Sequence, residues 1–459
     1  MDIDNNTFIQ QISITFHDNQ ENKHCPTIFS NNDMNFGTFN IQLKETIINK
    51  NPMFIFFSND ISGSMSDYCS DERTKMTHSI HAIRNILTLL DSYTDEIEIW
   101  IQVDAFDDNI EKIIPLQKIN HSNLDSMLSS LKKMRPRNGT NIELALNNAL
   151  KEIQSFKEKN PDYLITHIFT TDGNSTAGTS DIYSLSSLLN QEIKNIFIGF
   201  GLDHSVLTLN GLANSYSKGE YFFIDEIENG GLVYGEIIHS LLYSAFQDIR
   251  IGIENGFIYD YKKNKWTNEL YIDSLFSKSN KTYHLSSIHP SSIIVYVVGK
   301  NMSGDMVYIG KKDYEINNLT SYIFRQKIQE LLFQCNDSFI KTDIEKVLNH
   351  LKQYMNECNL NDNDLLKSLH DDLWIILNTE GTKLSKMFLT ARSNSNGKQL
   401  SYNINKIPNN KYKNFDFQFD NTLLSREPLN KMNSTPKQVE IMRSCSQPIR
   451  DYDYDSDEY

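Results

Sequence analysis

One carboxylate and two hydroxyls stand at alternate positions in a short polar segment near residue 60. The three residues are Asp60, Ser62 and Ser64, and Gly63 separates the two serines. In a locally extended chain this spacing points all three side chains to the same side, and the glycine lets the backbone turn tightly between the hydroxyls. Carboxylate and hydroxyl oxygens are hard ligands, which suit Mg²⁺, Mn²⁺ or Ca²⁺ better than zinc. The segment therefore predicts a divalent-cation site, unless it is only a polar turn that caps the next helix.

The elements that flank this segment predict an α/β sheet. A short apolar run at residues 53–57 ends just before Asp60, and a helical pattern follows at residues 73–93. Such alternation predicts an open, doubly wound, mostly parallel sheet with helices on both faces. Ligands of these sheets collect at the carboxyl ends of the strands, which is where Asp60 stands. Further strand patterns lie at residues 97–106, 110–114, 164–170, 196–200 and 221–224, and helical patterns at 124–133, 141–157, 182–189, 205–215 and 232–246.

Two further loops extend the pattern. The run Arg137-Asn138-Gly139-Thr140-Asn141 precedes one predicted helix, and Thr171-Asp172-Gly173 follows a predicted strand. Together with the segment at Asp60, they resemble in order the three parts of the metal-ion-dependent adhesion site of von Willebrand factor A domains. The resemblance covers residues 51–248 and implies a Rossmann-like, doubly wound α/β fold. Three parts in the expected order make a far more specific signal than the first segment alone.

The resemblance also implies a set of metal ligands. In that family the hydroxyl ligands would be Ser62, Ser64 and Thr140, while Asp60 and Asp172 would hold the ion directly or through water. Neutral hydroxyls and water-mediated carboxylates leave the cation under-neutralised, with one coordination position open. An Asp or Glu of a partner protein would fill that position. The implied function is a protein-interaction module that depends on Mg²⁺, with Mn²⁺ or Ca²⁺ as alternative ions.

Two positions depart from the family's pattern without removing a ligand. Asn59 stands where an apolar residue is common, and Asn138 stands where glycine is frequent. A degenerate domain that keeps the fold and binds no metal is the alternative. The chain would then be a metal-free scaffold or adaptor in a multiprotein assembly, such as a ubiquitin-pathway complex or a viral particle.

The sequence offers no set of nucleophile, base and orienting group, so it does not predict an enzyme. It lacks GxxxxGK[ST], HExxH and GxSxG, which are the marks of phosphate-binding, zinc-protease and esterase sites. A metal-dependent hydrolase is the weakest hypothesis, because it would need a general base near the metal. The candidates are Asp104, Asp107 and Asp108, which fit loop and hairpin positions better.

Histidines and cysteines give weaker signals of a metal site. His78 and His81 share a helical face, but satisfied histidines are far commoner than ligands. His17, His24 and Cys25 lack a fourth partner at zinc spacing. The five cysteines are scattered, without a CxxC pair, and fit reduced thiols.

The rest of the chain predicts four further parts. Residues 1–50 carry two strand patterns that we expect to join the short strands of residues 249–317 in a small β-sandwich. Residues 318–392 have helical periodicity. Residues 393–459 are polar and end in the acidic run 451–458, and such composition is typical of disorder. That run could occupy the metal site of its own chain, although a solubilising role is the simpler interpretation.

The charge and hydropathy of the chain limit the classes of function that it can have. The chain has 459 residues, 44 basic and 59 acidic, with a net charge of −15, which argues against a nucleic-acid partner. No apolar stretch approaches the roughly 20 residues of a membrane span, and no secretory signal begins the chain. We therefore expect an intracellular, cytoplasmic protein, or a component of a virion if the source is viral. The Asn-, Ile- and Lys-rich composition resembles proteins of AT-rich amoebal or giant-virus genomes.

Overall fold

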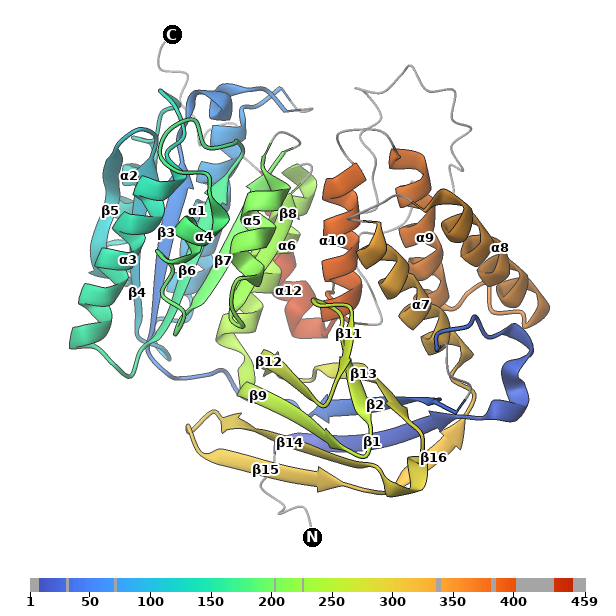
Figure 1. The fold of residues 1–459 in the computed structure, drawn as a ribbon. Coiled ribbons are helices and arrows are strands. Elements are labelled where there is room, and N and C mark those ends of the chain that lie inside the picture. The colour runs from blue at the N-terminus through green and yellow to red at the C-terminus, as the bar shows by residue number, and fades with distance from the viewer. Residues whose placement is uncertain are drawn as a thin grey trace. The chain divides into compact units, whose positions relative to one another are not determined.

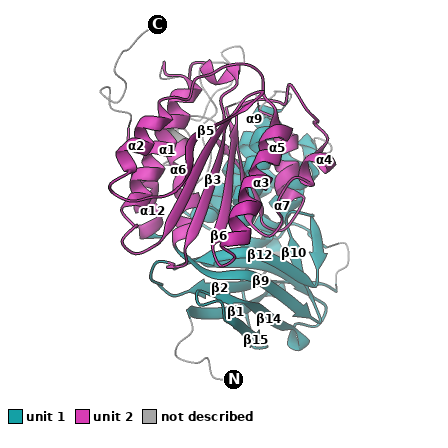
Figure 2. Ribbon diagram, turned by 90° about the vertical axis from the view of Figure 1, so that its left-hand side faces the viewer, with its two compact units in different colours: residues 1–48, 243–435 teal, residues 49–242, 436–459 magenta. Residues whose placement is uncertain are grey.

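The computed structural model describes residues 8–29, 33–69, 72–201, 204–224, 227–335, 340–380, 385–401 and 433–448. The chain divides into two compact units, coloured separately in Figure 2. An α/β unit consists of residues 49–242 and 436–459, and a second unit consists of residues 1–48 and 243–435. The acidic run 451–458 lies outside the described residues.

The α/β unit is built on a six-stranded sheet of order β5-β4-β3-β6-β7-β8. All neighbouring strands are parallel except β5, which pairs antiparallel with β4 at one edge. The central strand β3 is buried along its whole length, as expected of a strand covered on both faces. The strands are β3 (Met53–Asp60), β4 (Ile99–Phe106), β5 (Ile110–Lys118), β6 (Leu164–Thr171), β7 (Lys194–Phe200) and β8 (Gly219–Ile224).

Helices cover both faces of this sheet (Figure 2). One side carries α1 (Lys75–Asp91), α2 (Leu124–Leu131) and α6 (Ile227–Leu242); the other carries α3 (Ile142–Lys159), α4 (Ile182–Ser186) and α5 (Val206–Asn214). On the α3 side, Phe54 packs against Phe156 with ring centroids 4.3 Å apart. Ile153 belongs to the same buried cluster. The predicted doubly wound, mostly parallel α/β fold is confirmed.

A short helix from the far end of the chain completes the α/β unit. Helix α12 (Pro436–Cys445) packs against α6 and α1, beside which it is drawn in Figure 2. It lies within the range that composition predicted to be disordered, so the sequence analysis missed it. A proline at its first position suits a helix start, where a backbone N–H has no intrahelical partner.

The second unit contains two β-sheets that share one apolar core. The first has the order β11-β10-β13-β2-β1-β16 and the second β12-β9-β14-β15, so the N-terminal strands lie in one sheet with later strands (Figure 1). The strands are β1 (Ile9–His17), β2 (Asn35–Leu43), β9 (Ser244–Glu254), β10 (Phe257–Asp260), β11 (Lys265–Thr267), β12 (Glu269–Phe276), β13 (Asn280–Ser287), β14 (Ile294–Asn301), β15 (Met306–Lys311) and β16 (Tyr314–Asn317), with 3-10 turns at Asn19–His24 and Pro290–Ser292.

In the described part of the second unit, four helices surround a separate apolar cluster. They are α7 (Thr320–Gln334), α8 (Lys341–Glu357), α9 (Asp364–Thr379) and α10 (Ser385–Lys398). Arg392 is almost wholly buried and pairs with Asp372 at 2.8 Å, because a buried charge needs a partner. Among the described residues, no helix is long and apolar enough to cross a membrane.

At the end of α6, the structure has a strand where the sequence predicted helix. The pattern at residues 232–246 predicts helix to Phe246, whereas α6 ends at Leu242 and β9 begins at Ser244. Phe246 is fully buried in the core of the sandwich. Apolar residues near the junction fit either element, and their burial in the sheet core decides the boundary.

Candidate metal centre

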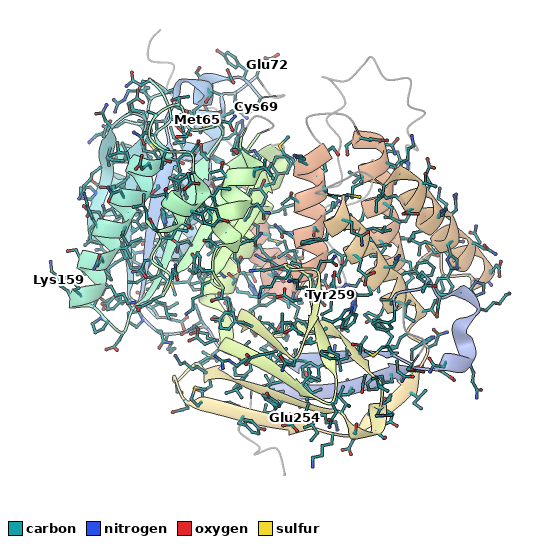
Figure 3. The ribbon with its side chains drawn as sticks, viewed as in Figure 1. Met65, Cys69, Glu72, Lys159, Glu254 and Tyr259 are labelled. Atoms are coloured by element: carbon teal, nitrogen blue, oxygen red, sulfur yellow. The ribbon has the colours of Figure 1, made fainter. Side chains whose placement is uncertain are left out.

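Three loops meet at the carboxyl end of the α/β sheet. The first follows β3 and contains the 3-10 turn Gly63–Ser66, the second precedes α3, and the third follows β6. Met65, in the first loop, lies at the opposite end of the sheet from Lys159, where α3 ends (Figure 3). The backbone N–H of Gly63 donates to the carbonyl of Asn138, and that of Arg137 donates to Ile61. These bonds join the first two loops.

Asp60 is fully buried at the end of β3. One carboxylate oxygen accepts the backbone N–H of Ser62 at 2.7 Å, and the other accepts the hydroxyl of Thr171 at 2.5 Å. Burial raises the pKa of Asp60 to about 6, although these hydrogen bonds lower it in part. The negative charge of Asp172 also raises it. The carboxylate is therefore held in place by a hydrogen bond to each oxygen.

The hydroxyls and the second carboxylate converge on one point. Ser62 Oγ lies 3.1 Å from Ser64 Oγ, and Ser64 Oγ donates to Asp172 Oδ1 at 2.7 Å. Thr140 Oγ1 and Ser64 Oγ lie 3.5 and 3.6 Å from the point where a Cβ on Gly173 would stand. The structure thus brings the five predicted residues together at the carboxyl ends of β3 and β6.

Lys75 is a member of the site that the sequence analysis missed. Its Nζ donates to Asp172 Oδ2 at 2.7 Å and lies 3.3 Å from the more exposed Asp67. Burial lowers the pKa of Lys75, but the hydrogen bond and charge of Asp172, together with Asp67, outweigh that effect and raise it. The side chain therefore places a positive charge against one metal-ligand candidate. Lys75 begins a helix that the sequence predicted, but no local pattern distinguished it from a surface lysine.

The loop of residues 137–141, which carries Thr140 and is called the threonine loop below, is held by Asp107, which is fully buried. Asp107 Oδ2 accepts Arg137 Nε and Asn138 Nδ2, both at 2.8 Å. Burial raises the pKa of Asp107. The hydrogen bonds from the backbone N–H of Asn109 and from Arg137 and Asn138 together outweigh burial, so the pKa lies below its ordinary value. Position 139 favours glycine because Thr176 comes close to it: a Cβ there would lie 2.5 Å from Thr176 Oγ1.

The two departures from the family's pattern have local explanations. Asn138 has a φ of 56°, a left-handed conformation that asparagine tolerates better than most residues. Asn59 is buried, and its side-chain oxygen accepts the hydroxyl of Ser79 on α1 at 2.6 Å. Each amide therefore makes a hydrogen bond that an apolar residue or a glycine would not.

Helix α3 fixes the far side of the threonine loop. Asn141, next to Thr140, caps the helix by accepting the backbone N–H of Leu144 at 2.9 Å. The backbone N–H of Thr140 donates to Thr176 Oγ1 at 2.7 Å, and the backbone N–H of Thr176 donates to Thr140 O at 2.8 Å. The hydroxyl of Thr140 thus comes from a residue whose backbone is fixed on both sides.

The donor set fits a hard divalent cation. It combines three hydroxyls with two carboxylates, and Mg²⁺, Mn²⁺ and Ca²⁺ all favour oxygen ligands. No three His, Cys, Asp or Glu side chains gather at any metal site within the described ranges. A site of this kind would not form such a group, because most of its donors are hydroxyls.

The hydrolase candidates already have partners. Asp104 accepts hydrogen bonds from Gln102 and Asn148, Asp107 holds the threonine loop, and Asp108 accepts the backbone N–H of Gly139. Each carboxylate has a structural contact, and the arrangement does not assemble a nucleophile with a base and an orienting group.

The histidine and cysteine candidates have contacts of their own. His81 Nε2 lies 2.6 Å from the carbonyl of Gln447, and His78 is buried in α1. In the second unit, Cys25 Sγ lies 3.4 Å from His17 Nε2. None of the five cysteines forms a disulfide.

Comparisons with known proteins agree with this geometry. Residues 56–174 match the model of the von Willebrand factor type A domain family. That match spans all three loops of the candidate centre. The α/β unit thus has a von Willebrand factor A fold, and domains of this class usually serve as interaction modules.

The chain also resembles solved structures. The ArnB paralog VWA2 from Sulfolobus acidocaldarius superimposes with a TM-score of 0.50 at 13% identity, over 85% of this chain and 98% of that chain. A von Willebrand factor type A protein from Catenulispora acidiphila gives 0.47 at 13% identity, over 84% and 91%. Proximal thread matrix protein 1 from the mussel byssus, in a structure with a zinc-occupied MIDAS motif, gives 0.35 at 20% identity, over 47% and 52%. No curated protein matches in sequence.

Replacement of Asp107 tests how the threonine loop is held. In Asp107→Ala we expect the amide of Gly63, which donates to Asn138, to exchange its hydrogen about tenfold faster or more. The reason is that hydrogen bonds to a charged group contribute roughly 1.5–3 kcal/mol. Hydrogen exchange of the full chain measures this, with Asp125→Ala on the exposed first turn of α2 as the matched control. An unchanged Gly63 rate in Asp107→Ala would mean that other contacts hold the loop.

Proposed function

We propose that the α/β unit is a metal-dependent protein-interaction module. Asp60, Ser62, Ser64, Thr140 and Asp172 would hold a divalent cation, with Mg²⁺ the expected ion and Mn²⁺ or Ca²⁺ able to replace it. When bound, the cation would supply an open coordination position for an Asp or Glu side chain of a partner protein. The observation that carries the proposal is the convergence of three hydroxyls and two carboxylates at one end of the sheet.

The charge of the centre supports an acidic partner. Asp60 and Asp172 contribute two negative charges and Lys75 one positive charge, so the three side chains sum to −1 when all are ionised. A divalent cation would change this sum to +1. The hydroxyls are neutral, and the exposed Asp67, 3.3 Å from Lys75, offsets only part of that excess charge, so a carboxylate from outside would be attracted. Burial of Asp60 and Asp172 strengthens the effect, since charges interact more strongly away from water.

Rigid loops support selective binding. The threonine loop is tied to Asp107 and capped onto α3, and the first loop is tied to it by backbone hydrogen bonds. Donors that are fixed before binding lose little conformational freedom when a ligand arrives. The centre is therefore suited to recognise one carboxylate geometry.

One observation favours a second candidate, a metal-free adaptor. Lys75 already neutralises one of the two carboxylates at 2.7 Å. If the ammonium held Asp172 too strongly for a metal to compete, the loops would form a fixed surface without an ion. The two candidates differ in metal affinity and in the effect of replacing Lys75.

Metal titration of the full chain tests the proposed centre. We expect saturable binding of Mg²⁺ and Mn²⁺ by calorimetry, weakened in Thr140→Ala and lost in Asp60→Asn and Asp172→Asn, because the amides keep the shape but not the charge. Asp125→Ala should bind like the wild type. Absence of binding in the wild type, with folding verified by circular dichroism, would leave the metal-free adaptor.

Replacement of Lys75 separates charge from geometry. In Lys75→Met we expect Mg²⁺ to bind about tenfold more tightly or more, because Asp172 is no longer shared with an ammonium. The variant should also melt at a lower temperature without metal, since a buried charge without its partner is strongly destabilising, and should recover when Mg²⁺ is added. Lys75→Arg, which keeps the positive charge, is the matched control in calorimetry and thermal melts. Weaker metal binding in Lys75→Met would instead show that the lysine supports the site.

A further inference from the structure

Helix α12 lies against α1 and α6, two helices on one face of the sheet. Its side chains Gln438 and Met442 are fully buried, and Ile441 and Cys445 nearly so. Gln438 Nε2 donates to Glu236 Oε2 on α6 at 2.5 Å. This contact places a polar pair in the buried interface, which gives the docking a fixed register in addition to apolar burial.

Two glycines of α6 make room for the backbone of α12. A Cβ on Gly235 would lie 2.5 Å from the Cα of Met442 and 3.0 Å from its backbone nitrogen. A Cβ on Gly231 would lie 2.5 Å from the Cα of Ser446. Because these are backbone atoms rather than the tips of flexible side chains, α12 would have to move if either glycine gained a side chain. The glycines, four residues apart, lie on one face of α6.

Helix α1 contacts the C-terminal end of α12. Asn85 Nδ2 donates to the carbonyl of Cys445 at 3.0 Å, and His81 Nε2 lies 2.6 Å from the carbonyl of Gln447. These carbonyls lie at the C-terminal end of α12, where helix carbonyls need partners from outside the helix. The docked helix is therefore capped by side chains of the surface that receives it.

Helix α1 contacts the candidate metal centre directly, and α6 contacts strand β6, which ends at the centre. Helix α1 carries Lys75, which binds Asp172. On α6, the hydroxyl of Tyr234 lies 3.3 Å from Thr170 Oγ1, and the next residue, Thr171, donates to Asp60. His81 follows Lys75 by six residues, a distance of about 9 Å along a helix. A shift of α12 can therefore reach both carboxylates of the centre through rigid elements.

We propose that the surface formed by α1 and α6 is a helix-docking site, and that α12 is its resident ligand. The docked helix holds α1 so that Lys75 stays on Asp172, which lowers the affinity of the centre for metal. Release of α12 loosens the first turn of α1, frees Asp172 and raises metal affinity. Coupling is reciprocal, so bound metal weakens the docking of α12. The inference has two parts. The metal arm, which is the effect of α12 on metal affinity, rests on the proposed function. The docking arm, which is the binding of α12 to α1 and α6, does not.

Glycine variants of the full chain test the inference. The double variant Gly231→Ala/Gly235→Ala inserts two methyl groups against the α12 backbone, and alanine favours helix in α6 itself. Gly230→Ala is the matched control, because its Cβ would meet only methyl groups of Ile224 at 3.8 and 3.9 Å. We expect hydrogen exchange in α12 and in the first turn of α1 to rise about tenfold or more in the double variant alone. We also expect about fivefold tighter Mg²⁺ binding by calorimetry.

The outcomes separate the two arms. Unchanged exchange in α12 would overturn the docking site. Faster exchange in α12 with an unchanged first turn of α1, or with unchanged or weaker Mg²⁺ binding, would overturn the coupling. If neither wild type nor variant bound Mg²⁺, the proposed function and the metal arm would fail together, and the exchange of α12 would still decide the docking arm.

Discussion

The carboxylate of Asp172 is the point on which the candidate centre depends. One oxygen accepts the hydroxyl of Ser64 and the other accepts the ammonium of Lys75, both at 2.7 Å. A fully buried carboxylate is costly unless it is paired and hydrogen-bonded, so the rest of the local structure has to deliver these two donors. The loop after β3 supplies one and the first turn of α1 supplies the other. A divalent cation would enter as a second positive charge beside a carboxylate that already has one.

Parallel strands make this arrangement possible. The carboxyl ends of β3 and β6 meet at one edge of the sheet, which brings Asp60 within hydrogen-bond distance of Thr171 and places Asp172 one residue further on. The threonine loop needs separate support, because it precedes a helix rather than following a strand. Asp107 provides that support from the loop after β4. The centre is thus assembled from three loops, one of which depends on a fourth segment, the loop after β4.

Much of this could be predicted from sequence, and the reasons for the gaps are physical. Alternating strand and helix patterns predicted the doubly wound sheet, because periodicity reports which face of an element is buried. The grouping of Asp60, Ser62 and Ser64 follows from local spacing, whereas Thr140 and Asp172 were reached only through a family resemblance. The role of Lys75 was not predicted because its partner lies 97 residues away in the sequence, and no local pattern encodes such a pairing. Helix α12 was not predicted because its buried face includes the polar Gln438 and packs against glycines of another helix.

Anomalous diffraction from crystals of the full chain soaked in Mn²⁺ tests the central claim most directly. The account predicts a single strong manganese peak among the three loops, roughly 2.0–2.6 Å from the hydroxyl oxygens of Ser62 and Ser64. It also predicts that Asp172 and Thr140 border the peak. A map without a peak in this position, with Lys75 still on Asp172, would contradict the account and leave these loops as a metal-free surface.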